Sequence, residues 1–505
     1  MIAKAIFKTV FCLLIACEII SCNAPVTKNA SKPISDNIDT ADKKLTVKSM
    51  HDDLFILWSA IKEIHPGYGF YTTTDSLQRA YDKMYTSINS PLNEGQFMAN
   101  IYPFLCNLRC GHTQLKHAVN YKPSPNIKVP HLPFEVLVRN HKAWVTTHIT
   151  PGLTTGDEII SINGIPVNEI IDHGAELYCG DGYNETFKEL FLSEYDGFED
   201  ACNKYYHWPG PYRIQLLNKR GAVQTLQVNA VSTDASQWPL NNKATDNYTD
   251  WTTARNTGAL SLRFLNNSKT ALFESKPFAY ADTLVYKEAF KQIQQRGIKN
   301  LILDMRHNTG GDLRVAIQLL SYLADAPFNI VNDIKSRVPN PSINHFEKYF
   351  DTARTSSFNQ GFKPGVKEGQ WFHIEAKPVF GKLYGPLPLT KANHFNGNLF
   401  VLIDGATFSS AALFSVALKA QRKNVIFIGR ETAGAEEGCN GGTIQELTLP
   451  NTKIRVDFPW MRVVSAAKKP SRGPGLMPAY TVNYTPGDVV AKNDPDLKKA
   501  LSLIK

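Results

Sequence analysis

The spacing of apolar positions changes twice along this chain and divides it into three regions. Between residues 46 and 118, apolar residues recur every three or four positions in three runs, which predicts three helices. From 125 to 232, short alternating segments are separated by turn residues, as in a β-rich unit. From 250 to 490, short apolar strands alternate with amphipathic helices, which predicts an α/β core with parallel strands. The predicted fold is therefore multidomain α/β, with a polar, proline-containing loop at 336–369 that forms a flap near the functional cleft.

The first 45 residues differ from the rest. Two lysines precede an apolar run that ends in small residues and cysteines, which predicts a secretory signal at 1–22, followed by a polar linker at 23–45. The cysteines resemble the lipid-attachment signal of bacterial lipoproteins, and we expect acylation at Cys22, with Cys17 as the alternative. A plain cleaved signal or an uncleaved anchor is the competing interpretation. The expected location is extracytoplasmic, with a lipid anchor in a bacterial membrane.

Composition narrows the possible functions. The 505 residues are 43% hydrophobic and 20% charged, which is typical of a globular protein. The net charge of +9 includes no block of lysine and arginine, so we expect no nucleic-acid partner. The cysteines beyond the leader are odd in number and lack zinc-site spacing, so we expect neither a metal nor a cofactor.

One stretch, 399–412, combines a short apolar strand, an Asp-Gly turn and the start of an Ala- and Leu-rich helix. Ser409 lies at the junction, where its hydroxyl can reach the open end of a sheet and the helix N–H groups point at the atom that it attacks. The alternative is that Thr407, Ser409 and Ser410 only cap the helix.

Paired glycines, Gly310 and Gly311, separate the apolar strand at 300–304 from the next helix. A phosphate-binding loop is excluded because the Gly-x4-Gly-Lys-Ser/Thr pattern is absent. An oxyanion hole fits better: one glycine N–H together with the N–H of Ser410 would hold a tetrahedral oxyanion. His112 follows a glycine at a helix end and could point into the same cleft, or it could be a structural histidine.

These segments resemble a known family. Residues 304–311 read Asp-Met-Arg-His-Asn-Thr-Gly-Gly, which is similar to the Asp-x-Arg-x-Asn-x-Gly-Gly strand end of the C-terminal-processing (tail-specific) and tricorn-like serine peptidases. Residues 407–411 resemble the family's nucleophile segment, and 429–434 its Gly-x-x-Thr-x-Gly turn. Residues 156–164 resemble the signature of PDZ domains, which bind extended peptides at a sheet edge. The resemblance implies a helical cap, a PDZ-like domain and a crotonase/ClpP-like peptidase core.

The resemblance also implies roles for residues. Ser409 corresponds to the nucleophile, and the Ser410 N–H with that of Gly310 or Gly311 to the oxyanion hole. The lysine of the processing branch is absent, since residues 435–437 read Ala-Glu-Glu. The tricorn-like branch uses a histidine from the cap, which corresponds to His112. The acid that supports it has no counterpart at its expected place; the carboxylates left open for this role are Glu431 and Glu437, then Glu436 and Asp404.

The expected function is therefore that of a serine-type endopeptidase that hydrolyses extracytoplasmic proteins or peptides. Its PDZ-like domain would recruit peptide or unfolded protein, and its lipid anchor would hold it at the membrane. The missing lysine and acid leave open a second interpretation, a catalytically weak or inactive peptide- or ligand-binding lipoprotein on the same fold. An acyl-CoA enzyme with the related core is disfavoured, because no catalytic pair of carboxylates stands out.

Overall fold

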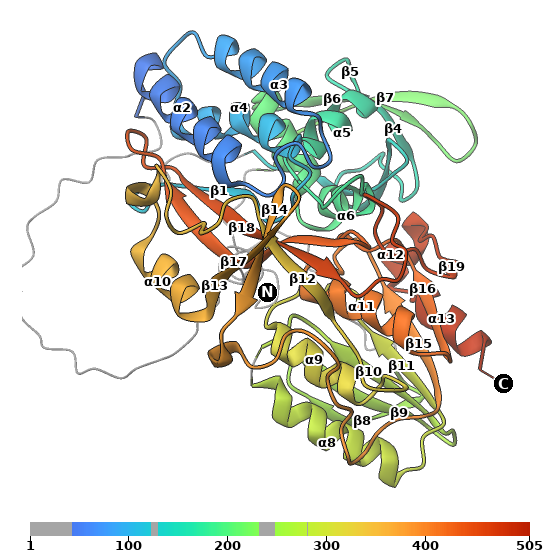
Figure 1. The fold of residues 1–505 in the computed structure, drawn as a ribbon. Coiled ribbons are helices and arrows are strands. Elements are labelled where there is room, and N and C mark those ends of the chain that lie inside the picture. The colour runs from blue at the N-terminus through green and yellow to red at the C-terminus, as the bar shows by residue number, and fades with distance from the viewer. Residues whose placement is uncertain (1–42, 123–129, 232–247, 280, 505) are drawn as a thin grey trace, which may run out of the picture.

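The computed structural model describes residues 43–122, 130–231, 248–279 and 281–504 (Figure 1). The predicted signal peptide, Cys22, Cys17 and nearly all of the linker lie outside the described residues. Within the described part of the chain, no helix combines the length and the apolar character needed to cross a membrane.

Three helices form the N-terminal region, as the apolar spacing predicts: α2 (Val47–Ile64), α3 (Thr74–Ser87) and α4 (Glu94–Cys106). Their inward side chains, among them Leu57, Leu77 and Phe97, are fully buried. They belong to the same apolar cluster as the helices and strands of the C-terminal region. The N-terminal helices therefore share a core with the C-terminal sheets.

The middle region is an antiparallel sheet in the order β2-β3-β4-β6-β7, with β5 paired to β4. It encloses a separate apolar cluster. Asn163 and Gly164 both have positive φ in the turn between β4 and β5, as the Asn-Gly hairpin prediction requires. The resemblance of this unit to a PDZ domain stays a prediction. Its elements are β2 (Phe134–Arg139), β3 (Lys142–His148), β4 (Glu158–Ile162), β5 (Ile165–Pro166), α5 (Val167–Ala175), α6 (Thr186–Glu194), α7 (Gly197–Ala201), η1 (Cys202–Tyr206), β6 (Tyr212–Leu217) and β7 (Val223–Val228).

The C-terminal region is built on a seven-stranded sheet in the order β19-β16-β15-β11-β10-β9-β8, in which β19 to β10 run parallel. Alternate strand residues face opposite sides, with α8, α9 and α11 packed on one face and α13 on the other. The α/β prediction is confirmed, and the unit extends past residue 490 into α13. Its elements are β8 (Trp251–Asn256), β9 (Leu260–Leu265), β10 (Thr270–Ser275), α8 (Asp282–Gln295), β11 (Asn300–Asp304), α9 (Leu313–Ser321), β15 (Asn398–Ile403), α11 (Ser410–Gln421), β16 (Val425–Gly429), β19 (Tyr480–Thr481), α12 (Pro486–Ala491) and α13 (Pro495–Ser502).

A second, antiparallel sheet joins the N-terminal helices to this core. Its order is β1-β18-β12-β14-β13, with β17 paired to β18. The three-residue strand β1 lies just after His112 and pairs with β18, with Gln114 opposite Asp457. The strands are β1 (Gln114–Lys116), β12 (Val331–Ser336), β13 (Phe362–Glu368), β14 (Trp371–Ala376), β17 (Gly438–Thr448) and β18 (Arg455–Ser465).

The prediction of a loop at 336–369 is wrong, because this stretch holds α10 (Thr352–Gly361), the short η2 (Glu347–Tyr349) and β13. Asp351 caps α10 by accepting the Arg354 N–H at 2.8 Å. Pro364 lies in β13, which is the edge strand of its sheet, where a missing N–H is tolerated. Another short turn, η3 (Pro378–Phe380), follows β14.

A buried carboxylate on α2 fastens the helical region to the second sheet. Asp53 is fully buried and accepts the backbone N–H groups of Asn451 at 2.9 Å and Thr452 at 2.7 Å, in the turn between β17 and β18. Its removal would leave buried donors without an acceptor.

We therefore expect Asp53→Ala to lower the free energy of unfolding by roughly 2–3 kcal/mol, as measured by chemical denaturation. The matched control is Asp52→Ala on the same helix. Asp52 makes an exposed ion pair with Lys48, so its loss should change stability by less than about 0.5 kcal/mol. Equal effects of the two changes would show that Asp53 does not fasten the turn.

Candidate active site

Ser409 lies between β15 and α11 in a backbone conformation that few non-glycine residues adopt, with φ 51° and ψ −126°. The preceding residues hold this turn against the end of β11. The Phe408 N–H donates to the carbonyl of Asn308, and the Thr407 hydroxyl donates to that of Met305, both at 3.0 Å. The Ser409 side chain makes no capping hydrogen bond, so the helix-cap alternative does not describe it.

His112 meets this serine from the other end of the chain. Its Nε2 lies 2.9 Å from the Ser409 Oγ, although 297 positions separate the two residues. The ring is 5% exposed and packs against Phe408, with 4.5 Å between ring centroids. Burial lowers the pKa of His112 to about 4, because the cationic form loses its hydration. The ring is therefore neutral at neutral pH, which is the form that can accept a proton.

The neighbours of His112 fix its position in the chain. Strand β1 begins two residues later, and Thr113 is held by a 2.8 Å contact between its hydroxyl and His65 Nε2. His65 is fully buried at the end of α2. The loop that carries His112 is therefore tied to both the helical region and the second sheet.

The glycine loop, which contains Gly310 and Gly311, lies directly beside Ser409. A Cβ atom on Gly310 would lie 2.7 Å from Cβ of Ser409, so only glycine fits there. The Gly310 N–H donates to the Asn308 side chain at 3.0 Å, and that side chain in turn donates to two carbonyls at the end of β10. Among the described residues, no partner is found for the N–H of Gly311 or of Ser410. These two groups are the available donors of the predicted oxyanion hole.

The carboxylates considered from sequence lie elsewhere. Glu431 accepts the Gly475 N–H at 2.7 Å, and Glu437 accepts the Tyr71 hydroxyl at 2.6 Å. Neither makes a hydrogen bond with His112. Asp404 accepts the Ala406 N–H at 2.9 Å within its own turn.

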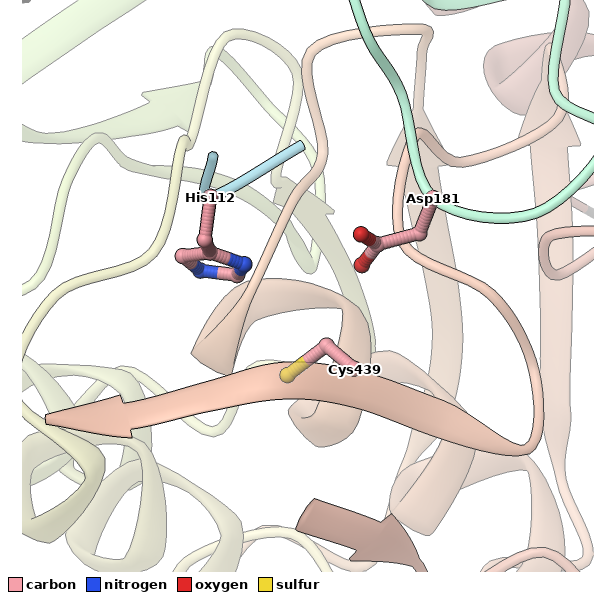
Figure 2. A group of neighbouring side chains, drawn as sticks. All are labelled: His112, Asp181 and Cys439. Carbon is pink, nitrogen blue, oxygen red and sulfur yellow. The ribbon is translucent and has the colours of Figure 1, made fainter. Parts of the chain in front are cut away.

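Asp181 is the carboxylate that sequence reasoning missed. One of its oxygens, a ring nitrogen of His112 and the Cys439 sulfur all lie within 4.8 Å of one another. Figure 2 shows the three side chains converging from three different segments of the chain. Asp181 lies between α5 and α6 of the middle region, in a stretch without a recognisable motif, so nothing in the sequence singled it out.

Within the described ranges of the chain, two groups of side chains have the composition of metal ligands. The first is His112, Asp181 and Cys439, and the second is Asp333, Glu368 and His373 on the strands β12 to β14. In the second group the two ring nitrogens of His373 bind the two carboxylates at 2.8 Å each, so this group is explained by ion pairing.

A small cavity of about 90 Å³ opens beside Ser409. Gly311, Ser409 and Ser410 form part of its lining. The stretch predicted as a flap contributes to its wall, together with β12, α11 and β18. Its apolar lining residues include Ile334, Phe362, Phe380, Leu383, Leu413 and Val463.

Comparison with known proteins identifies the C-terminal region. Residues 271–462 match the model of Peptidase family S41. The chain contains a family S41 peptidase domain. This domain includes the glycine loop, Ser409 and the β17–β18 hairpin, and it places the chain among the serine-type peptidases, as the sequence motifs predict. No curated protein matches the chain.

Solved structures resemble the S41 domain together with its flanking regions. The structure of mature CPAF complexed with lactacystin superposes with a TM-score of 0.58 at 15% identity, over 90% of this chain and 97% of that chain. At this identity the likeness concerns the fold, and it spans all three regions. A putative peptidase from Parabacteroides merdae covers 90% of this chain and 96% of its own, at 12% identity and a TM-score of 0.46. The match to the photosystem II D1 C-terminal processing protease covers 86% of this chain and 93% of that chain, at 15% identity and a TM-score of 0.37.

The contact between Gly310 and Ser409 gives a prediction. We expect Gly310→Ala to lower the rate at which a phosphonate probe labels Ser409 by at least about tenfold, because the new methyl group displaces the loop from the serine. Gly369→Ala is the matched control. Gly369 also has positive φ, but a Cβ there meets no atom within 4 Å, so it shares the backbone strain and should keep the labelling rate. Equal losses in both variants would contradict the expectation.

Proposed function

We propose that this protein is a serine endopeptidase in which Ser409 is the nucleophile and His112 the general base. The single observation that carries the proposal is the 2.9 Å contact between Ser409 Oγ and His112 Nε2 within an S41 fold. It favours catalysis over the binding-only interpretation, which would need no histidine at the serine hydroxyl.

The geometry supports a standard acyl-transfer sequence. His112 Nε2 takes the hydroxyl proton as Ser409 Oγ forms a bond to the peptide carbonyl carbon. The oxyanion is stabilised by the free N–H groups of Gly311 and Ser410. The protonated ring then gives its proton to the amine that leaves. In the second half of the reaction water attacks the acyl-enzyme while His112 accepts its proton. The ring then returns this proton to Ser409 Oγ as the bond to the acyl carbon breaks and the acid product leaves.

The substrate in this proposal is a peptide or an unfolded protein. The available N–H groups of Gly311 and Ser410 can bind the oxygen of a peptide carbonyl. The middle region would recruit the chain by adding it to a sheet edge, in the manner of a PDZ domain. The signal-like residues 1–22, with lipid attachment at Cys22, support an extracytoplasmic, membrane-anchored location.

Replacement of the nucleophile tests this function. Ser409→Ala should reduce kcat for hydrolysis of an unfolded protein by at least about 10³-fold, since no other group can form the acyl-enzyme. Ser415→Ala is the control. Ser415 is a fully buried serine on the same helix that only donates to the Ala411 carbonyl, and the variant should remain active. Unchanged hydrolysis by Ser409→Ala would refute the proposal.

The apolar cavity gives a second test. Peptides that place leucine next to the scissile bond should be cleaved about 10–100-fold faster, in kcat/KM, than the same peptides with aspartate there, because burial of a leucine side chain is worth roughly 2 kcal/mol. A series of peptides differing at that one position measures the ratio. A ratio near one would show that the cavity does not hold this side chain.

A further inference from the structure

The proposed reaction leaves one atom of His112 unexplained. When Nε2 accepts the serine proton, the ring carries its own proton on Nδ1, and that N–H must point somewhere. His112 Nδ1 is buried and has no hydrogen-bond partner among the residues that the structure describes. Buried donors in proteins are almost always paired, so an orphaned Nδ1 beside a nucleophile points to a missing acceptor.

An orphaned acceptor lies next to it. Asp181 is 1% exposed, and its Oδ1 accepts the N–H of Gly111, the residue before His112, at 2.9 Å. Its Oδ2 is buried and accepts no hydrogen bond from any described residue. A carboxylate oxygen of Asp181 and a ring nitrogen of His112 lie within 4.8 Å of each other, and in Figure 2 the carboxylate faces the ring. One water molecule spans such a separation, and a small movement of the ring also closes it.

Other groups near the ring do not fill this role. Cys439 is the third member of the cluster, but burial raises the pKa of its thiol well above the ordinary value, so it stays a neutral, weak acceptor. Glu437 is already engaged by the Tyr71 hydroxyl and the Gly473 N–H. Burial raises the pKa of Asp181 to about 7, and the hydrogen bond from the Gly111 N–H and the positive charge of Arg462 act against this rise.

The segment that carries Asp181 is held firmly against the catalytic region. The N–H of Asp181 donates to the Ala433 carbonyl at 3.3 Å, and that of Gly182 donates to the Arg109 carbonyl at 3.0 Å. Asn184 donates from its side chain to the Thr432 carbonyl at 2.8 Å. The segment is thus fixed on one side by the loop before His112 and on the other by the turn after β16.

We propose that Asp181 is the positioning residue of His112, which holds the ring in its Nδ1-protonated form and stabilises the imidazolium that forms when Ser409 attacks. The proton from Ser409 goes to Nε2, and the Nδ1 proton stays on the ring. This inference rests on the proposed function. It also gives the middle region a direct part in the active site, since Asp181 lies between α5 and α6.

The test compares variants that differ in charge alone. Asp181→Asn keeps the size of the side chain and an oxygen for the Gly111 N–H, but it removes the charge. We expect kcat on a peptide substrate to fall at least about 100-fold with KM changed by less than about threefold. Asp157→Asn is the matched control, because Asp157 is also a buried aspartate of the middle region that accepts a backbone N–H, from Thr154 at 3.1 Å.

A second comparison separates positioning from folding. Asp181→Glu and Asp181→Gln disturb packing equally, but only the Glu variant keeps a carboxylate. Phosphonate labelling of Ser409 should therefore be at least about tenfold faster in the Glu variant, even if both variants are destabilised. In a His112→Ala background, Asp181→Asn should change the residual labelling by less than about twofold, because its partner is gone.

Two outcomes would overturn the inference: equal rates for the Glu and Gln variants, or the same loss from Asp181→Asn with and without His112. Full activity of Ser409→Ala would instead refute the proposed function itself. An inactive Ser409→Ala variant combined with a fully active Asp181→Asn variant would overturn the role of Asp181 alone.

Discussion

The contact between Ser409 and His112 is the interaction on which the arrangement of this protein depends. The serine lies at the end of a strand in the parallel sheet, and the histidine lies in a loop after the third N-terminal helix. A hydroxyl and an imidazole meet at 2.9 Å only if both backbones are held rigidly. The strained φ of Ser409 persists because the loop after β11 binds the same turn through backbone and side-chain hydrogen bonds.

The second sheet explains how a histidine from the N-terminal helices is held in place. Strand β1 follows His112 and adds to β18, and the carboxylate of Asp53 caps the turn that precedes this strand. The helices and the C-terminal sheets also share one apolar cluster. The packing of the helical region therefore holds the geometry of the candidate active site.

Burial shapes the chemistry of the site and creates a conflict within it. It lowers the pKa of His112 to about 4 and raises that of Asp181 to about 7, because a dry environment disfavours both charged forms. The proposed reaction nevertheless requires a transient imidazolium on His112. A neighbouring carboxylate resolves the conflict, since two opposite charges at close range compensate each other's lost hydration better than either does alone. Among the described residues, neither His112 Nδ1 nor Asp181 Oδ2 has a hydrogen-bond partner. This is expected of a pair that has not yet come within hydrogen-bond distance.

The sequence predicted the local elements around Ser409 and the glycines, but it could not predict which residues from distant parts of the chain would lie beside each other. Strand, turn and helix around Ser409, and the glycines at 310 and 311, are short-range patterns, because apolar periodicity and glycine placement act over a few residues. His112 was one of two open possibilities from its place after a glycine at a helix end, and only the resemblance to a family gave it the role of base. The stretch 336–369 was mistaken for a loop because an edge strand tolerates proline. Asp181 carries no local signal. Its place beside His112 arises from backbone hydrogen bonds between segments far apart in the chain, which only the tertiary structure brings together.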